Sequence, residues 1–391
     1  MIRVLWKMPK SSGWTGGLNY FRNLCAALYS LPDRSVDPVL LGGGDNLPEP
    51  LCRCPRIPAY SGLPRSYVHP RSIRNKLEMI FLGHGKDYDR YLRQNGIKLL
   101  SHLSYPSGWT SVPFLAWIPD FQHMYLPQYF SEEEIESRTR HFLQLARAAH
   151  GVLLSSETAR QDFNRFHPGF EYKAHVLRFV AIPMPAEELP PPEQVLSKYQ
   201  IEEPFFHVPN QIWAHKNHDV ILDALCIMKK RGQKPPLVIS TGLTMDHRDP
   251  GFFEALSERV STAGMSERFR FLGLIDFREA SVLMRNAVAL INPSLFEGWS
   301  TTVEEAKSLG KKMLLSSIPV HQEQAHGRCS FFEPSDAGQL AIDMVQLLES
   351  YNQQVEDAAM EDADQSLEER VYDYGMRYAD IVHQFTILSQ H

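Results

Sequence analysis

The sequence predicts an α/β protein with two Rossmann-like, doubly wound parallel-sheet domains that face a cleft. Short apolar runs alternate with longer amphipathic segments along most of the 391 residues, a pattern typical of strand–helix–strand units and parallel sheets. This length suits two domains, at roughly 150 residues or more each. A proline-rich stretch at residues 182–192 divides the series into two halves. Neither a Gly-x-Gly-x-x-Gly nor a P-loop sequence follows a predicted strand, which disfavours dehydrogenases and kinases.

The first half begins with a strand, because residues 2–6 are apolar and lead into a Gly-Gly helix start at residues 16 and 17. A long segment, residues 132–149, has apolar residues at helical spacing and therefore predicts an amphipathic helix. The remaining elements follow from short apolar runs and the amphipathic segments between them. We expect strands at 2–6, 38–41, 98–101, 114–118, 151–155 and 175–180, and helices at 16–29, 87–94, 132–149 and 157–166.

The second half is more regular, since each short apolar run is followed by one amphipathic segment. Such an alternation indicates a parallel sheet whose crossovers are helices. We expect strands at 205–208, 237–241, 269–272, 288–292, 312–316 and 330–332, and helices at 217–230, 252–263, 277–287, 300–309, near 320, and at 336–349.

Domain boundaries are expected where the composition changes. Residues 182–192 contain many prolines, which fix φ and remove backbone donors, so this stretch predicts a linker. We therefore assign residues 1–185 to an N-terminal, acceptor-side domain and residues 186–371 to a C-terminal domain. A last helix at 372–391, after an acidic stretch at 356–369, is expected to cross back onto the first domain.

Composition excludes several protein classes. With 43% hydrophobic and 22% charged residues, the chain is an ordinary globular protein and not a disordered or fibrous one. No apolar run approaches the ~20 residues that span a bilayer. Lys7 and Lys10 follow the first apolar run instead of preceding it, so we expect no signal peptide. The five scattered cysteines, with Cys52 and Cys54 too close for a loop-closing disulfide, predict a reduced, cytoplasmic protein without a structural metal. A redox or metal pair at Cys52 and Cys54 is the alternative.

Charge is distributed unevenly. Residues 1–100 hold 15 Lys and Arg against 7 Asp and Glu, whereas the whole chain has a net charge of −6. Most of the excess lies in residues 53–98, where tyrosines are interleaved. This region is either a solvated face or a surface for an anionic acceptor or anionic lipid headgroups. Nucleic acid is not expected as a partner, because the chain is acidic and has no recognition motif.

The segment at residues 292–310 is the most informative part of the chain. A strand ends near Ser294, a short loop carries Glu297 and Gly298, and a helix begins at residues 300–302, which are Ser-Thr-Thr. A helix start offers backbone N–H groups to an anion. Carboxylates at Glu297 and Glu305 would accept hydrogen bonds from hydroxyl groups. A sugar nucleotide has both features; the alternative is an ordinary helix start with surface acids.

This pattern resembles retaining glycosyltransferases of family four, which have the GT-B fold. Glu297 and Glu305 match the family's E-x7-E pattern, and residues 271–273, 292–294, Gly310 and 332–336 fit its second domain. The resemblance implies that Glu297 contacts the donor sugar and Glu305 the nucleotide ribose. It also implies that Gly298, Ser300, Thr301 and Thr302 lie at the donor.

The family places an arginine and a lysine on the donor diphosphate, early in the second domain. Here Lys216 matches the lysine, whereas Asn210 or Gln211 stands where the arginine is expected. We predict that Lys216 and Asn210 contact the donor, and that His215 or Arg248 compensates for the missing positive charge.

In the first half, Gly16 and Gly17 stand where the family has a glycine-rich loop close to the diphosphate. Asp120 matches the aspartate of the family's His-Asp segment, but Pro119 replaces the histidine. His123 is therefore the candidate substitute that lines the cleft, with a loop histidine whose hydrogen bonds are satisfied as the alternative. In the second half, His321 and Glu323 follow a strand end and either touch the ligand or begin a helix.

The predicted function is a retaining transfer of a sugar from a UDP- or GDP-sugar to a hydroxyl of a glycan or lipid-linked acceptor, in cell-surface polysaccharide synthesis. No metal or other cofactor is expected, so Glu297, Lys216, Asp120 and His123 are the candidates for the chemistry. The alternatives are a sugar-nucleotide isomerase or hydrolase and a non-catalytic nucleotide-sugar-binding subunit. Peripheral contact at the inner face of the membrane is expected through the basic region at 53–98.

Overall fold

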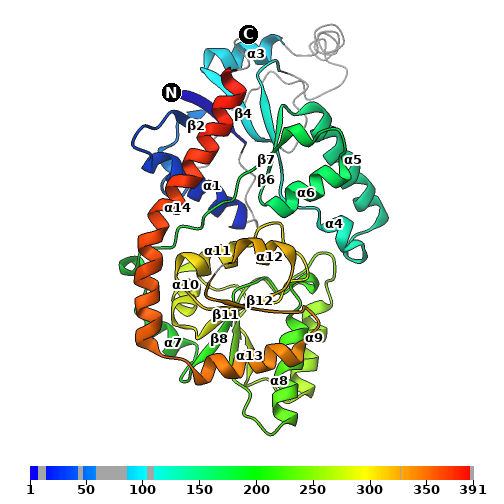
Figure 1. Cartoon of the computed structure of the whole chain (residues 1–391), viewed down its shortest axis with the longest axis vertical. Coiled ribbons are helices and arrows are strands. Elements are labelled where there is room, and N and C mark those ends of the chain that lie inside the picture. Colours follow the sequence, from blue (N-terminus) through cyan, green and yellow to red (C-terminus); the bar gives the residue numbers. More distant parts are fainter. Residues whose placement is uncertain (8–14, 43–46, 59–85, 104–109, 326, 388–391) are drawn as a thin grey trace. The chain divides into compact units, whose positions relative to one another are not determined.

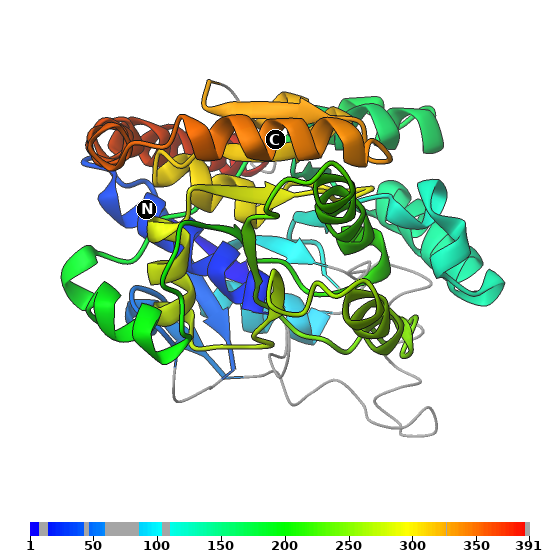
Figure 2. The same ribbon diagram turned by 90° about the horizontal axis from the view of Figure 1, so that it is seen from below.

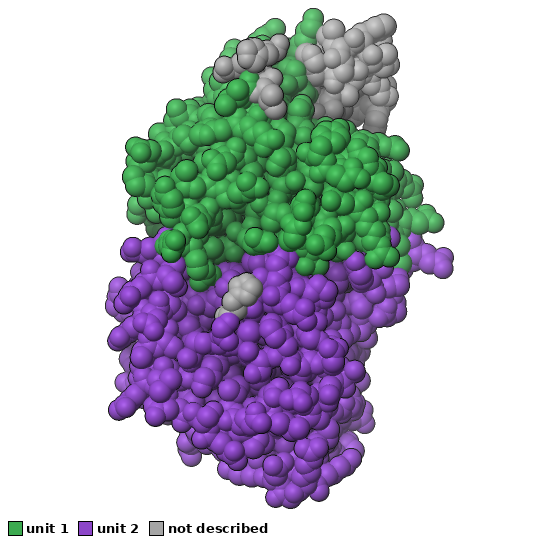
Figure 3. Space-filling view, viewed as in Figure 1, with its two compact units in different colours: residues 1–121, 133–180, 369–391 green, residues 122–132, 181–368 purple. Residues whose placement is uncertain are grey.

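The computed structural model describes residues 1–7, 15–42, 47–58, 86–103, 110–325 and 327–387. The chain forms two compact units (Figure 3). Unit 1 comprises Met1–Phe121, Glu133–Val180 and Glu369–His391, and unit 2 comprises Gln122–Glu132 and Ala181–Glu368. The boundary between the two domains was expected after residue 185. In the structure the chain passes from unit 1 to unit 2 between residues 180 and 181.

Unit 1 contains a parallel sheet of seven strands in the order β3-β2-β1-β4-β5-β6-β7 (Figure 1). The sequence expectation lacked the short strand β3, and β7 ends four residues before the predicted end at 180. The strands are β1 (Ile2–Trp6), β2 (Val36–Leu41), β3 (Arg56–Ile57), β4 (Ile97–Leu103), β5 (Phe114–Ile118), β6 (Gly151–Leu154) and β7 (Ala174–Val176). The helices of the first half are α1 (Thr15–Ser30), α3 (Lys86–Gln94), α4 (Gln122–Tyr125), α5 (Glu132–Ala148) and α6 (Glu157–Phe166).

Unit 2 contains a parallel sheet of six strands in the order β10-β9-β8-β11-β12-β13. These strands are coloured from green to orange in Figure 2. Its strands are β8 (Phe205–Val208), β9 (Leu237–Ser240), β10 (Phe269–Phe271), β11 (Ala289–Asn292), β12 (Met313–Ser316) and β13 (Cys329–Phe332). Its helices are α7 (Pro192–Lys198), α8 (His218–Lys230), α9 (Phe252–Thr262), α10 (Phe277–Asn286), α11 (Thr301–Ser308), α12 (Pro319–Gln324) and α13 (Ala337–Glu349). All these strands agree with the expected ones to within one residue at each end.

Helices cover both faces of the sheet in unit 2, so that it has two cores. Along β11, Ala289 and Ile291 pack into the core shared with α8 and α13, while Leu290 packs into the core shared with α10 and α11. Alternate residues of a strand point to opposite faces, so each strand contributes to both cores. The predicted doubly wound parallel fold is therefore confirmed in each unit.

The C-terminal helix is longer than predicted. The acidic stretch at 356–369 is helical and forms one helix with the residues after it, α14 (Gln353–Ile387). This stretch contains mainly strong helix formers, and the fully buried Glu356 carboxylate pairs with Lys312 at 3.1 Å and with Arg328 at 2.6 Å. Helix propensity and these ion pairs explain why the helix begins well before residue 372, where the sequence placed its start.

The two ends of α14 belong to different units. Residues up to Glu368 belong to unit 2, and residues from Glu369 belong to unit 1. In unit 1 the Tyr378 hydroxyl accepts a hydrogen bond of 2.7 Å from the Trp6 indole on β1. Gly375 lies so close to Ala27 of α1 that an added Cβ would come within 2.6 Å of its carbonyl oxygen. Within the described part of the chain, no helix combines the length and the apolar character needed to cross a membrane.

Candidate functional site

The candidate site lies at the carboxyl ends of β8 and β11. In the sheet of unit 2 the chain runs outward from β8 to β9 and β10, then returns to pair β11 with the other edge of β8. Ligands of open parallel sheets bind where the strand order reverses in this way. The loops at residues 209–217 and 293–300 follow these two strands, and they carry Lys216 and Glu297.

Lys216 and Glu297 form an ion pair in which Nζ lies 2.5 Å from Oε1. Their side chains are only 15% and 11% exposed, respectively. Burial favours the neutral form of the Glu297 carboxyl, but the charge of Lys216, the nearby His321 and hydrogen bonds from Lys216 and Ser294 together hold its pKa below the usual range. Glu297 is therefore an anion at neutral pH, held against a cation at the end of the sheet.

A buried network of side-chain amides and hydroxyls is hydrogen-bonded to the Glu297 carboxylate of this pair. The Asn292 side chain, fully buried at the end of β11, accepts from Asn210 Nδ2 at 3.1 Å and from Ser294 Oγ at 2.7 Å. Its own amide donates to Ser300 Oγ at 2.8 Å. Ser294 Oγ also lies 2.8 Å from Glu297 Oε1, so the network joins both strand ends to the carboxylate.

Asn210 belongs to this buried network. It is 5% exposed, its side-chain nitrogen donates to Asn292, and its side-chain oxygen accepts a hydrogen bond of 2.9 Å from the Thr302 hydroxyl. These two bonds connect the end of β8 to helix α11. The predicted contact of Asn210 with the donor stays a prediction.

The start of α11 offers amide groups, although fewer than predicted. The Ser300 amide donates to Gln324 Oε1 at 3.0 Å, and the Ser300 and Thr302 hydroxyls point into the buried network. Across the described residues, the structure gives no partner to the amides of Thr301, Thr302 and Val303. Free amides in the first turn of a helix attract an anion.

Gln324 of α12 fixes the position of this helix start. Besides accepting from the Ser300 amide, its Nε2 donates to Ser300 O at 2.7 Å and to Glu304 Oε1 at 3.1 Å. Glu304 is 1% exposed and pairs with Lys307 of the same helix at 2.8 Å, so its carboxylate stabilises α11. Glu305, the predicted ribose ligand, is half-buried on the same helix. Gly298 lies half-buried in the loop before it.

Arg248, in the loop after β9, contacts the loop after β8. Its Nη2 lies 3.1 Å from Nδ1 of His215, and its Nη1 donates to Gln122 Oε1 at 2.9 Å. Burial, with the charges of Lys216 and Arg248 added, lowers the pKa of His215 to about 2. The His215 ring is therefore neutral at every physiological pH.

His321 of α12 lies near the Glu297 carboxylate. It is fully buried, and its Nδ1 lies 3.0 Å from Ser316 O and 3.1 Å from Ser316 Oγ. Burial lowers the pKa of His321 to about 4 in spite of the nearby Glu297 carboxylate. Glu323 is half-buried on the same helix. Both residues are thus in α12, and their contact with a ligand stays a prediction.

Residues 122–132 come from the first half of the sequence but belong to unit 2. Tyr125 of α4 stacks on Phe296, the neighbour of Glu297, with ring centroids 5.4 Å apart. His123, the candidate imidazole, is 1% exposed, and its ring lies edge-on to Phe130 at 6.4 Å. His123 is thus a buried residue of helix α4, and a chemical role for it stays a prediction.

The other predicted residues belong to unit 1. Gly16 and Gly17 lie in the first turn of α1, and Asp120 is half-buried just after β5. Their roles toward a donor stay predictions. Among the residues that the structure describes, no group of three or more His, Cys, Asp or Glu side chains could hold a metal ion.

Sequence reasoning missed Gln324 and the stacking of Tyr125 on Phe296. Gln324 lies 24 positions after Ser300, and Tyr125 lies in the other half of the chain. Neither stands in a pattern with its partner, so no local signal could have identified them. Arg248 was named as a candidate cation, but its contact with His215 follows only from the folded loops.

Comparison with known proteins agrees with this geometry. The model of the family Glycosyl transferases group 1 matches residues 205–350, which include both halves of the site. The O-antigen chain mannosyltransferase RfbU of Salmonella typhimurium is 27% identical over 136 residues, which are 34% of this chain and 36% of that protein. The match thus spans about a third of this relative.

Solved structures resemble the chain over nearly its whole length. A glycosyltransferase from Rickettsia africae has a TM-score of 0.67 at 15% identity, covering 99% of this chain and 98% of that one. Alr3699/HepE of Anabaena, crystallised with UDP and glucose, has a TM-score of 0.68 at 15% identity, covering 98% and 100%. At such identities the likeness concerns the fold. The chain therefore has the GT-B fold, and its residues 205–350 match the Glycosyl transferases group 1 family.

Proposed function

We propose that the protein is a glycosyltransferase that moves a sugar from a UDP- or GDP-sugar to a hydroxyl of a glycan or lipid-linked acceptor, with retention at the anomeric carbon. One observation carries this proposal: the Lys216–Glu297 pair lies at the reversal of strand order, beside a helix start with free amides. Anion-binding and hydroxyl-binding groups thus come together in unit 2. The name of the curated relative supports a role in cell-surface polysaccharide synthesis.

The proposed roles follow from the charges. Lys216 and the amides of residues 301–303 hold the donor diphosphate, whose negative charge grows as the glycosidic bond breaks. Glu297 accepts hydrogen bonds from the donor sugar hydroxyls, and Glu305 accepts them from the ribose. Lys216 then exchanges part of its contact with Glu297 for the phosphate. Gly16 and Gly17 are proposed to approach the diphosphate with their backbone.

Retention is proposed to follow front-face attack. The acceptor hydroxyl attacks the anomeric carbon on the side of the leaving group, and a phosphate oxygen of the departing nucleoside diphosphate takes the hydroxyl proton. The new bond joins acceptor oxygen to anomeric carbon, and the bond to the phosphate oxygen breaks. A double displacement would need a carboxylate on the other face, for which Asp120 is the candidate. No metal is required in either route.

Replacing Glu305 by glutamine is the direct test. Glutamine keeps the shape of the side chain but removes the charge, which weakens a charge-assisted hydrogen bond by about 1.5–3 kcal/mol. We expect kcat/KM for the donor to fall about 10- to 100-fold. Release of nucleoside diphosphate from UDP- and GDP-sugars, with a glycan acceptor present, measures this.

Glu349→Gln, at the end of α13, is the control and should transfer sugar at the wild-type rate. Full activity of Glu305→Gln would contradict the proposed site. Conversion of the donor without an acceptor would instead indicate an isomerase or a hydrolase. Nucleotide binding without turnover for any acceptor would indicate a non-catalytic subunit.

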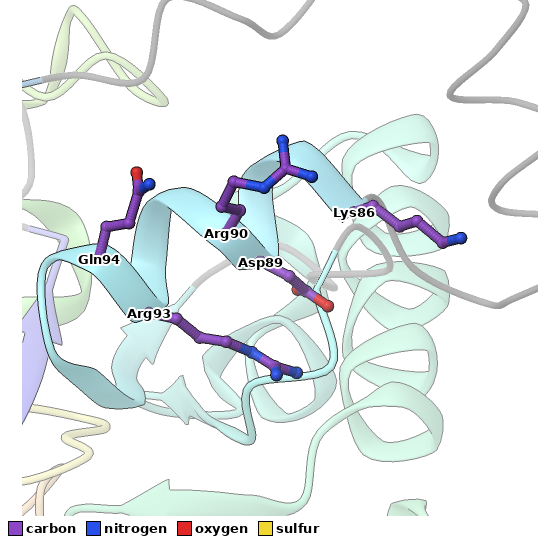
Figure 4. Close-up of a pocket in the computed structure, with 5 residues that line it drawn as sticks. All are labelled: Lys86, Asp89, Arg90, Arg93 and Gln94. Carbon is purple, nitrogen blue, oxygen red and sulfur yellow. The ribbon is translucent and has the colours of Figure 1, made fainter.

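The basic region is proposed to bind the phosphate groups of an anionic acceptor or of lipid headgroups. Within residues 53–98, positions 59–85 lie outside the described residues, but helix α3 is described. Lys86, Arg90 and Arg93 line a surface hollow of about 490 Å³ together with Asp89 and Gln94 (Figure 4). Asp89 is buried and accepts from Ser111, and Asp87 pairs with Arg90 at 3.3 Å, so the exposed face keeps an excess of positive charge from Lys86 and Arg93.

Replacing Arg90 and Arg93 together by serine should weaken binding to anionic membranes by about 10-fold or more, since each basic residue contributes ~1 kcal/mol near such a surface. Sedimentation with vesicles of phosphatidylglycerol, compared with phosphatidylcholine, measures this. The paired change Arg138→Ser and Arg140→Ser on α5 is the control. An unchanged vesicle affinity with a raised KM for a phosphate-bearing acceptor would assign the face to the acceptor. No effect in either assay would contradict the proposal.

A further inference from the structure

His215 makes one side-chain hydrogen bond that defines its protonation. Its Nδ1 lies 3.1 Å from Nη2 of Arg248. A guanidinium group has N–H donors and no acceptor, so Nδ1 must accept and cannot carry the proton. In the neutral ring the proton is then on Nε2. Neutrality follows from burial, which lowers the pKa of His215 to about 2 together with the charges of Lys216, Arg248 and His218.

Arg248 is held firmly in the orientation that produces this contact. Asp246 Oδ1 accepts from its backbone amide at 3.0 Å and lies 3.4 Å from its Nε. Gln122 Oε1 accepts from Nη1 at 2.9 Å. The rings of Phe130 and Trp213 lie 5.2 and 5.4 Å from the guanidinium carbon. These neighbours therefore hold the Arg248 guanidinium group in place before any ligand binds.

The position of His215 in the chain connects its contact with Arg248 to the candidate site. It directly precedes Lys216, and its backbone oxygen accepts a hydrogen bond of 2.8 Å from the Leu295 amide, in the loop that carries Glu297. The ring nitrogen Nε2 has no partner among the described residues. Asn210 of the same loop uses one N–H and its side-chain oxygen in hydrogen bonds to Asn292 and Thr302, so the His215 ring adds a donor that these contacts do not involve.

We propose that His215, with its proton fixed on Nε2 by Arg248, donates that proton in a hydrogen bond to the diphosphate of the donor. His215 thus takes the place of a second cation, and Arg248 is a positioning residue that acts through the ring. This proposal rests on the proposed function, because a nucleoside diphosphate is the ligand. A neutral N–H donor adds to Lys216 without placing two positive charges side by side.

The tautomer can be observed without any ligand. Long-range ¹H–¹⁵N spectra of the full chain, labelled in its histidine rings, separate a protonated from an unprotonated ring nitrogen. His215→Gln identifies the His215 signals by their disappearance. We expect an Nε2-protonated ring in the wild type, the same ring in Arg248→Lys, which keeps a pure donor, and a mixture of forms in Arg248→Met. Arg268→Met, which removes a guanidinium bonded to Glu203, is the control and should leave the His215 signals unchanged.

Calorimetry with UDP and with GDP tests the ligand. Glutamine places its amide N–H near the position of Nε2, whereas asparagine places it near Nδ1. We expect His215→Asn to lose about 10- to 100-fold in affinity, the range for a hydrogen bond to a charged group, and His215→Gln to lose less than 5-fold, by the same reasoning. Arg248→Met should lose about 2- to 5-fold, because affinity falls with the fraction of rings that keep the proton on Nε2.

The outcomes separate the two proposals. A His215 ring protonated on Nδ1, or on both nitrogens, in a chain that binds nucleotide overturns the inference and leaves the proposed function intact. Equal affinities for the glutamine and asparagine variants overturn the contact with the diphosphate. If the wild-type chain binds neither nucleotide, the proposed function fails and the ligand of His215 fails with it.

Discussion

Replacing Lys216 by methionine is expected to slow sugar transfer by about 10³-fold, the upper end of what the loss of one preorganised charge-stabilising donor costs. Lys216 is a cation at the reversal of strand order, only 15% exposed, and methionine preserves most of its apolar length. Without it, the charge that develops on the leaving diphosphate is met only by neutral donors. Nucleoside diphosphate release under saturating donor measures the effect on kcat.

Stability separates this role from a purely structural one. Lys216→Met leaves the Glu297 carboxylate without its counter-ion, which should lower the free energy of unfolding by about 2–3 kcal/mol. Adding Glu297→Gln removes the unpaired charge, so the double variant should regain at least 1 kcal/mol, a typical coupling for contacting residues, while remaining inactive. Lys229→Met, on the exposed side of α8, is the matched control. Lys216→Met retaining more than a tenth of the wild-type rate would contradict the proposed role.

Replacing Asn292 by alanine is expected to lower the free energy of unfolding by about 3 kcal/mol. The change removes four hydrogen bonds at a fully buried position and leaves Asn210 Nδ2 and Ser300 Oγ without their Asn292 partner. Each unsatisfied buried group costs about 1 kcal/mol or more. Equilibrium chemical denaturation of the wild type and the variant measures the change in the free energy of unfolding.

The control is Asn286→Ala, since Asn286 donates only to Val282 O of its own helix and should cost less than about 1 kcal/mol. A smaller loss for Asn292→Ala than for Asn286→Ala would show that the network does not stabilise the strand ends. A second readout is nucleotide affinity, which should fall in Asn292→Ala because Ser294 and Ser300 both position groups of the site.

The order of elements could be predicted from the sequence because it depends on local patterns. In unit 2, apolar runs such as residues 289–292 and the amphipathic segments between them predicted every strand of the sheet. The location of Lys216 and Glu297 at strand ends followed from the same pattern. The prediction of an element was wrong where tertiary contacts, and not the local pattern, determine the structure. The last helix, predicted to begin at residue 372, begins at Gln353, and Glu356 in the acidic stretch is buried against Lys312 and Arg328.

The roles within the site were decided largely by the tertiary structure. Asn210 was predicted to contact the donor because of its position in the chain, but only folding shows that it contacts Asn292 and Thr302, which are 82 and 92 positions away. Gln324 and the segment at residues 122–132 join the site in the same way.

The sequence by itself determined the two parallel sheets, the strand ends that hold the site and the charged residues placed there. Only the tertiary structure decided which polar groups form hydrogen bonds with one another and which remain for a ligand. The physical reason is that periodicity and helix starts depend on neighbours within one or two turns. Hydrogen-bond partners depend on where distant loops meet, as with Arg248 and His215, and no local pattern encodes that meeting.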